Sequence, residues 1–280
     1  MGIIDGKMVA SQIKENITTE VQSLKKKTGK TPGLAVVLVG DDPASAVYVR
    51  NKNKTCNNIG FQSFENILPA NTSEPELLNL IHELNNDEKV NGILVQLPLP
   101  NHIASNKILE AINPQKDVDG FHLENVGRLV TGHSLFKPCT PAGIIKLLDK
   151  YDVEIEGKNA VIIGRSNIVG KPVAFLLLER NATVTICHSR TKNLSNLARS
   201  ADILIAAIGK PNFVTADMVK DNSVVIDVGI NRLAGKLVGD VDFSAVLKKA
   251  FLITPVPGGV GPMTIAMLME NTFRAFKNSL

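Results

Sequence analysis

The feature that most constrains this chain is a short apolar run followed directly by a glycine-containing turn and a helix-forming stretch. Residues 159–163 are mostly β-branched and apolar, which predicts a strand buried on both faces. The turn GRSNIVGKP follows at 164–172, and residues 173–179 favour a helix. This succession is typical of the first βα unit of a dinucleotide-binding fold, in which a pyrophosphate lies against N–H groups at a helix N-terminus. The turn departs from G-x-G-x-x-G, because Ser166 replaces the second glycine and Gly170 comes one residue late, so an ordinary βα turn remains the alternative.

The remaining sequence alternates predicted helices and strands. The N-terminal half predicts helices at 6–27, 43–58, 73–85 (with a Ser73/Glu76 capping box) and 103–112, and strands at 34–40, 61–68 and 92–97. The C-terminal half predicts a helix at 141–151 capped by Thr140, strands at 183–187, 203–206, 224–228 and 252–254, helices near 193–199 and 215–219, a hairpin at 231–241 and a closing helix at 262–277. Such alternation predicts an α/β fold with parallel sheets. We expect one domain at 1–138, a Rossmann-like domain at 139–263, and a C-terminal helix (about 264–280) that packs on the first domain.

Composition excludes several classes of function. The net charge is only +4, aromatic residues make up 4% and there is no Trp, so the basic stripe with stacking aromatics of a nucleic-acid-binding protein is missing. The cysteines Cys56, Cys139 and Cys187 form no CxxC, and the histidines form no ligand cluster, which predicts neither disulfides nor a metal site. No apolar run approaches membrane-spanning length, so we expect a soluble cytoplasmic protein with no membrane partner.

The end of the strand at 183–187 indicates the cofactor. In NAD-specific folds an acidic residue about 20 positions beyond the glycine turn binds the ribose 2′-OH. Here His188, Ser189 and Arg190 follow the strand, and they offer hydrogen-bond donors and positive charge instead. Such groups suit a 2′-phosphate, which predicts NADP. A polar loop without a ligand is the alternative.

Two positions in the first half suggest proton-transfer chemistry. Tyr48 and Lys52 lie four residues apart and therefore share one face of a predicted helix. Alone, the pattern favours a solvated basic face, because Lys52 is one of three basic residues in five positions, with Arg50 and Lys54. Gln96 is the polar residue near the end of an apolar strand, where ligands of open α/β sheets gather. A cap for the turn that follows is the alternative.

Two loops could contact a ligand. In DVDG at 117–120 the D-x-D spacing lacks further metal ligands, so an Asx-type turn is the plain interpretation. Asp119 could instead accept two hydrogen bonds from an amidine-like ligand edge. The loop PGGVGP at 257–262 exposes backbone that a ring system could approach, or simply forms a turn.

Together these motifs resemble one family. SAVYVRNK at 45–52, VQLPLP at 95–100, KDVDGF at 116–121, GRSNIVGKP at 164–172 and PVPGGVGPMT at 255–264 occur in the same order as in the bifunctional methylenetetrahydrofolate dehydrogenase/methenyltetrahydrofolate cyclohydrolase family. The resemblance covers essentially the whole chain. It is closest to the stand-alone bacterial-type enzyme, because no synthetase domain is appended.

The resemblance implies an activity and a place for the active site. The family oxidises 5,10-methylenetetrahydrofolate with NADP and hydrolyses the 5,10-methenyl product to 10-formyltetrahydrofolate in one-carbon metabolism and purine biosynthesis. The active site is then expected in a cleft between the two domains, with no metal.

The resemblance also implies roles for individual residues. Lys52 would be the catalytic acid/base, Gln96 would hydrogen-bond it, Tyr48 would stack on the folate and Asp119 would hold the pterin amino edge. Further folate contacts are implied for Val95, Leu97, Pro257, Gly258, Gly259, Val260 and Gly261. NADP contacts are implied for Thr140, Gly164, Arg165, Ser166, Gly170, Ser189 and Ile230, with Arg165 at the 2′-phosphate.

The implied partners are small molecules and a second copy of the chain. Tetrahydrofolate derivatives, with or without a polyglutamate tail, would be the substrates, and the family suggests a homodimer. Two other classes of function stay open on sequence alone. One is a two-domain NADP-dependent dehydrogenase of a small hydroxy or keto acid, and the other is a non-catalytic NADP-binding sensor.

Overall fold

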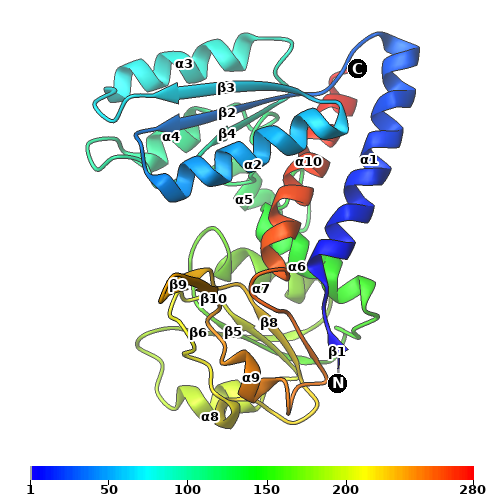
Figure 1. The fold of residues 1–280 in the computed structure, drawn as a ribbon, viewed down its shortest axis with the longest axis vertical. Helices are drawn as coiled ribbons and strands as arrows, with labels where there is room; N and C mark the ends of the chain where they lie inside the picture. Colours follow the sequence, from blue (N-terminus) through cyan, green and yellow to red (C-terminus); the bar gives the residue numbers. More distant parts are fainter. Residues whose placement is uncertain (1) are drawn as a thin grey trace. The chain divides into compact units, whose positions relative to one another are not determined.

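The chain forms two compact units. The computed structural model describes residues 2–280, with the backbone alone for Ala44 (Figure 1). One unit comprises residues 2–11 and 138–267 and is called here the 138–267 unit; the other comprises 12–137 and 268–280 and is called the 12–137 unit. The division falls inside α1 (Gly6–Thr28) and α10 (Val260–Asn278), which contribute residues to both units.

The N-terminus differs from the predicted domain boundaries. Residues 2–11 group with the 138–267 unit rather than with the residues that follow them. The reason is that β1 (Gly2–Ile3) pairs in parallel with β11 (Leu252–Ile253). At the other end of the predicted first domain, the division at 137/138 lies one residue from the expected one.

The 12–137 unit is built on a three-stranded parallel sheet in the order β3-β2-β4. Its other elements are α helices that follow each strand in turn. The bounds are β2 (Gly33–Val39), α2 (Pro43–Ile59), β3 (Gln62–Leu68), α3 (Glu74–Asn86), β4 (Gly92–Val95), α4 (Ser105–Ala111) and α5 (Leu123–Val130). The predicted capping box is confirmed, because Ser73 and Glu76 bond each other's backbone at the start of α3.

Helices cover both faces of this sheet. On one face α3 presents Leu77, Ile81 and Leu84, one or two turns apart, to alternate residues of β2. On the opposite face α2 and the end of α10 pack together, and Cys56 Sγ lies 3.6 Å from Met269 Sδ. Because β2 is buried on both faces, it reads as an unbroken apolar run rather than an alternating one.

The 138–267 unit is built on a six-stranded parallel sheet in the order β1-β11-β8-β7-β5-β6. Helices α6 and α7 pack together and α7 contacts β5 and β6, while α8, η1 and α9 contribute to the core on the opposite face. The bounds are α6 (Cys139–Lys150), β5 (Asn159–Ile163), α7 (Gly170–Glu179), β6 (Thr183–Cys187), α8 (Leu194–Arg199), β7 (Ile203–Ala206), η1 (Ala216–Met218), β8 (Val224–Asp227), β9 (Asn231–Leu233), β10 (Lys236–Val238) and α9 (Phe243–Val246).

The strand order places a topological switch point at β5. The chain passes from β5 outward to β6 and then returns to β7 on the other side of β5. In open parallel sheets, ligands bind outside the carboxyl ends of the strands at such a point. The carboxyl end of β5 is where the glycine turn begins.

Three predicted details need correction. Helix α6 begins at Cys139 with Pro138 at its N-cap, so Thr140 is not the cap; its hydroxyl lies 2.8 Å from that of Thr264. The predicted helix at 215–219 is the short 3₁₀ turn η1. Strand β1 and the short helices α5 and α9 were not predicted, because two to eight residues carry too little periodicity to be recognised.

Candidate functional site

Lys52 and Gln96 meet at the carboxyl ends of the strands of the 12–137 unit. Helix α2 packs on β2 and β3, and Gln96 directly follows β4, so two residues 44 positions apart come together. Lys52 Nζ donates to Gln96 Oε1 at 2.9 Å, and the lysine side chain is 8% exposed. Gln96 Nε2 donates to the carbonyl oxygen of Leu97 at 2.7 Å, which turns the amide oxygen toward the lysine. The lysine amine is therefore buried and bonded to the side-chain oxygen of Gln96.

Tyr48 lies one helical turn before Lys52. It is 39% exposed, so its ring presents a surface on the same face of α2 as the buried lysine. Val95, the last residue of β4, is buried, whereas Leu97 is half-buried. Asp42 caps α2, accepting a hydrogen bond from Ser45 N at 2.7 Å, which fixes the start of this helix.

The two aspartates of the 117–120 turn differ in environment. Asp117 is 1% exposed and accepts hydrogen bonds from His122 N and from Asn125 Nδ2, both at 2.8 Å. Burial raises the pKa of Asp117, and these hydrogen bonds oppose the rise. Asp117 therefore builds the turn and the start of α5, as the Asx-turn interpretation predicts. Asp119 is half-buried.

Cys56 lies one turn beyond Lys52 on α2. Burial raises the pKa of its thiol to about 12. A thiol that stays protonated at neutral pH is a poor nucleophile, so this cysteine packs rather than reacts.

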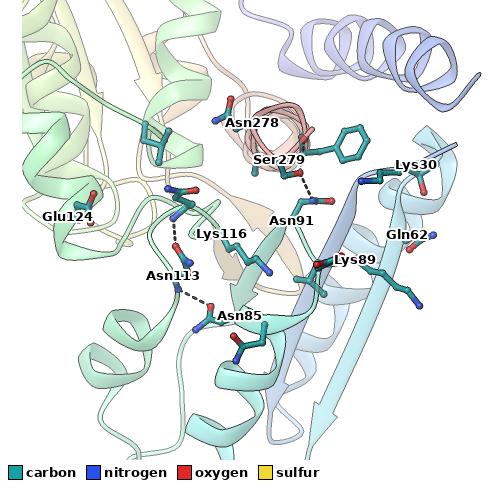
Figure 2. Close-up of a pocket in the computed structure, with 18 of the residues that line it drawn as sticks. Lys30, Gln62, Asn85, Lys89, Asn91, Asn113, Lys116, Glu124, Asn278 and Ser279 are labelled. Atoms are coloured by element: carbon teal, nitrogen blue, oxygen red, sulfur yellow. Dashed lines mark hydrogen bonds between the residues drawn. The ribbon is translucent and has the colours of Figure 1, made fainter. Parts of the chain in front are cut away.

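A cavity of the 12–137 unit lies at the opposite end of the sheet. It has a volume of about 960 Å³ and is bordered by the residues just before β2 and β4 and by the end of α10. Figure 2 shows that amide side chains dominate its wall, and many of them are already bonded: Asn91 donates to Ser279 Oγ at 3.1 Å, and Asn85 accepts from Asn113 N at 2.9 Å. These groups hold loops together, so size alone does not mark this cavity as the reactive site.

In the 138–267 unit, the turn after β5 has room only for glycine at positions 164 and 170. Gly164 has φ +129°, and a Cβ there would overlap the carbonyl oxygen of Ala207. A Cβ at Gly170 would overlap the carbonyl of Gly164. The turn thus packs against the end of β7 as closely as backbone allows, which is the arrangement of a dinucleotide-binding βα turn.

The cavity beside this turn is lined by cationic, hydroxyl and aromatic side chains. It measures about 310 Å³ and lies at the switch point, at the ends of β5, β6 and β7. Arg165, His188 and Lys210 supply positive charge or donors, Ser189 adds a hydroxyl and Phe213 adds an aromatic face. Among the described residues that line it, none is acidic. This donor set suits a phosphate and an aromatic base together.

The cavity contains residues that sequence reasoning missed. Ala207, Ile208, Lys210 and Phe213 all follow β7. The signal was available in principle, because β7 neighbours β5 and the residues after it must meet the glycine turn at the switch point. A one-dimensional motif search does not show that neighbourhood.

Other predicted cofactor residues lie outside the lining of this cavity. The Ser166 hydroxyl accepts from Val169 N at 3.1 Å and Gly170 N at 3.3 Å, so it occupies N–H groups at the start of α7 that were expected to face a pyrophosphate. Ile230 is 47% exposed after β8. Thr140 is bonded to Thr264, as described above.

The glycines of the 257–261 loop are used in packing. A Cβ at Gly6 would overlap the carbonyl oxygen of Gly259, and Lys7 N donates to the carbonyl oxygen of Gly258 at 3.1 Å. Gly258 has φ +114°. The loop therefore seats the start of α1 and leads into α10, which accounts for its glycines by turn chemistry.

Two family models match the chain. Residues 4–119 match the catalytic domain of tetrahydrofolate dehydrogenase/cyclohydrolase, and residues 138–280 match its NAD(P)-binding domain. The chain belongs to the tetrahydrofolate dehydrogenase/cyclohydrolase family. The resemblance seen in the sequence motifs is thereby confirmed.

Relatives of this dehydrogenase/cyclohydrolase match over the full length. The "Bifunctional protein FolD" of Campylobacter hominis is 60% identical over 281 residues, covering 100% of this chain and 99% of the relative. The crystal structure of the bifunctional FolD enzyme of Campylobacter jejuni is 54% identical, covers 100% of both chains and has a TM-score of 0.98. The Trypanosoma brucei enzyme, crystallised with NADP cofactor and inhibitor, is 41% identical with a TM-score of 0.96 and covers 99% of this chain and 97% of its own.

These similarities confirm the predicted activity class and cofactor. This dehydrogenase/cyclohydrolase is an NADP-dependent enzyme of tetrahydrofolate one-carbon metabolism, and its two α/β units with parallel sheets agree with the predicted fold. The other two classes of function, a hydroxy-acid dehydrogenase and a non-catalytic sensor, are not supported. Within residues 2–280, no helix is both long and apolar enough to span a membrane.

Proposed function

We propose that Lys52 is the acid/base of the cyclohydrolase reaction and that Gln96 positions it. The observation that carries the proposal is the 2.9 Å hydrogen bond from the buried Lys52 Nζ to Gln96 Oε1 at the carboxyl end of β4. The reaction pair is the oxidation of 5,10-methylenetetrahydrofolate to the methenyl cation, followed by hydrolysis of that cation to 10-formyltetrahydrofolate.

The oxidation requires orientation more than proton transfer. The two nitrogen lone pairs beside the methylene carbon favour loss of a hydride, and NADP, when bound, would supply the hydride acceptor. The chain's contribution is to hold the carbon and the acceptor in line. No side chain needs to remove a proton in this step.

The hydrolysis does require proton transfer. Water adds to the methenyl carbon and the added oxygen loses one proton. The bond from that carbon to N5 then breaks as the oxygen loses its second proton and N5 gains one, which leaves the formyl group on N10. A lysine amine within reach can take a proton from the oxygen and deliver one to N5. Gln96 holds the amine in place through an acceptor whose own orientation is set by the Leu97 carbonyl.

Other residues complete the proposed folate site. Tyr48 offers an exposed ring for stacking, and Asp119 offers a carboxylate for the pterin amino edge. Val95 and Leu97 flank Gln96 at the end of β4. The folate contact of loop 257–261 stays a prediction.

The cofactor site is proposed at the switch point of the 138–267 unit. Gly164 and Gly170 allow the close turn, and Arg165 and Ser189 line the cavity with donors for the 2′-phosphate. Ser166, Thr140 and Ile230 stay predicted contacts. The homodimer, the cytoplasmic location and the use of polyglutamylated folate are likewise proposals that rest on family likeness.

The lysine role is tested by measuring both reactions on one variant. Lys52→Met should slow methenyltetrahydrofolate hydrolysis by about 10²-fold or more, while the affinity for NADP is kept. Hydrolysis is followed by loss of methenyl absorbance and NADP binding by calorimetry. Lys54→Met is the matched control, because Lys54 is exposed two residues further along α2. Unchanged hydrolysis in Lys52→Met would remove the proposed role.

The cofactor site is tested by comparing NADP with NAD. Arg165→Ala should weaken NADP binding about tenfold and NAD binding by less than about twofold, because NAD lacks the 2′-phosphate that the guanidinium is proposed to meet. Arg190→Ala is the control, since Arg190 is exposed nearby but does not line the cavity. Equal losses for both cofactors would place the 2′-phosphate elsewhere.

A further inference from the structure

Two carboxylates of the 138–267 unit are buried beside the cavity at the switch point. Asp227 ends β8 and is 2% exposed; Asp240 follows β10 and is 0% exposed. Neither has been assigned a role above. Charges at this depth persist only where hydrogen bonds replace their hydration, so the partners of these carboxylates show what they hold.

Asp240 binds the backbone of the segment that follows β7. Its Oδ2 accepts from Ile208 N at 2.7 Å and Gly209 N at 2.9 Å, and its Oδ1 accepts from Lys210 N at 2.8 Å. Oδ1 also accepts from Asn231 Nδ2 at 2.9 Å. One carboxylate therefore fixes three successive peptide groups and the first residue of β9.

That segment is a wall of the proposed cofactor cavity. Ala207, Ile208, Lys210 and Phe213 line it, and Lys210 Nζ lies 5.7 Å from the centre of the Phe213 ring. Gly164 lies directly beside this segment, because a Cβ there would overlap the Ala207 carbonyl oxygen. The position of the 208–210 backbone therefore sets where the cavity's aromatic and cationic groups stand.

Asp227 holds Asp240 in turn. Its carboxylate accepts from Asp240 N at 2.8 Å, Val241 N at 2.9 Å and Gly229 N at 3.0 Å. Burial raises the pKa of Asp227 to about 6, so the group is still ionised and accepting at pH 7.5. The two aspartates thus form a chain of contacts from β8 to the cavity wall.

Two glycines make room for this arrangement. A Cβ at Gly229 would overlap Asp240 Oδ1, and a Cβ at Gly239 would overlap Asp227 Oδ2. Each carboxylate therefore packs directly against backbone, where a larger side chain has no space. The close approach leaves little freedom for Asp240 to shift or to be replaced by a longer acid.

We propose that Asp240 is a positioning residue for NADP, acting through the 208–210 backbone and through Asn231. It does not touch the cofactor; it holds the residues that do. The inference rests on the proposed function, which assigns the cavity beside Gly164 to NADP. A role in fold stability alone is the competing explanation, and the two differ in what they predict for the cofactor-independent reaction.

The test uses a variant of nearly the same size. In Asp240→Asn, whichever carboxylate oxygen becomes the amide NH₂ then faces two donors: the Ile208 and Gly209 N–H groups, or Lys210 N and Asn231 Nδ2. The 208–210 backbone must move away. We expect the dissociation constant for NADP, measured by calorimetry on the full chain, to rise about tenfold or more, and the KM for NADP to rise with it.

Two further measurements and a control variant distinguish a positioning role of Asp240 from a role in fold stability alone. Hydrolysis of methenyltetrahydrofolate, which consumes no NADP, should stay within about twofold of the wild type. Amide hydrogen exchange of the peptide containing Ile208, Gly209 and Lys210 should accelerate in the ligand-free variant. Asp242→Asn is the matched control: Asp242 caps α9 through Ala245 N at 3.2 Å and should leave NADP affinity unchanged.

A milder variant covers the case in which Asp240→Asn does not fold. Asn231→Ala removes one of the four hydrogen bonds to Asp240 and should weaken NADP binding by about twofold to fivefold, with hydrolysis unchanged. Unchanged NADP affinity in both variants, or equal loss of both activities, would overturn the proposal. Arg165→Ala then shows which proposal has failed. If Arg165→Ala also leaves NADP affinity unchanged, the assignment of the cavity to NADP is wrong. If Arg165→Ala weakens NADP binding while the Asp240 and Asn231 variants do not, only the role of Asp240 is wrong.

Discussion

The two ends of the three-stranded sheet in the 12–137 unit carry similar residues in different bonding states. At the carboxyl end, Lys52 donates to a side-chain amide, that of Gln96. At the amino end, Lys116 donates to backbone carbonyls, those of Leu84 at 3.2 Å and Asp87 at 2.8 Å. An amide also stands just before β4, where Asn91 accepts from Gly33 N at 2.8 Å.

The two ends differ in the hydrogen-bond partners of their polar side chains. Lys116 closes the C-terminal end of α3, where unpaired carbonyls and the helix dipole favour a cation. Asn91 satisfies a buried N–H at the start of β2. Lys52 instead donates to the side-chain oxygen of Gln96, whose amide is oriented by the Leu97 carbonyl, so this bond joins two side chains.

The largest expected effect concerns the amide at the carboxyl end. Gln96→Ala removes an acceptor of Lys52 and should slow methenyltetrahydrofolate hydrolysis by the folded protein by about 10²-fold. A loss of stability from the unpaired buried amine is expected as well. Hydrolysis and urea unfolding are measured on the same preparation. If Gln96→Ala lowered the free energy of unfolding while hydrolysis stayed normal, Gln96 would have only a structural role, as Asn91 does at the other end of the sheet.

The amide at the amino end should show the reverse. Asn91→Ala leaves the buried Gly33 N–H without its acceptor, so the free energy of unfolding should fall by about 1–3 kcal/mol. Both enzyme activities of the folded fraction should remain within about twofold of the wild type. A selective loss of hydrolysis in this variant would mean that the amino end contributes to the reaction.

The smallest expected effect is a pH dependence at Lys116. Burial lowers the pKa of Lys116 in the folded chain below the ordinary value of a lysine, which the unfolded chain keeps. Between these two pKa values the unfolded chain binds more protons, so raising the pH favours the folded state. The stability of the wild type relative to Lys116→Met should therefore increase from pH 8 to pH 10.5, as measured by urea unfolding at each pH. A constant or shrinking difference would show that the Lys116 ammonium bears no cost of burial.

Much of the fold was predictable because local signals were strong. Strands 183–187 and 203–206 were predicted with the observed bounds, since β-branched runs there end at polar loops. The Ser73/Glu76 capping box marked the start of α3. By contrast, β1 is two residues long and is stabilised by pairing with β11 some 250 positions away, which no local window contains.

The candidate site was predictable only in part. Tyr48 and Lys52 share a helix face by spacing alone, but that spacing favoured an exposed basic face, whereas in the structure Lys52 is buried against Gln96. The glycine turn was recognised from Gly164, but the residues within 207–213 that also line the cavity were not predicted. Asp227 and Asp240 gave no signal, because aspartates beside glycines in a sequence usually mean a turn.

The amino-acid sequence by itself determined the alternation of strands and helices, the glycine positions and the family, because these depend on neighbouring residues and on ordered motifs. The tertiary structure decided which polar groups are hydrogen-bonded to each other. Whether a lysine donates to a side-chain amide or to the carbonyls at a helix end, and whether an aspartate faces water or accepts from three peptide N–H groups, depends on partners brought together by strand order. Lys52 and Asp240 are distinguished from the chain's other charged residues only by what packing places within hydrogen-bond distance.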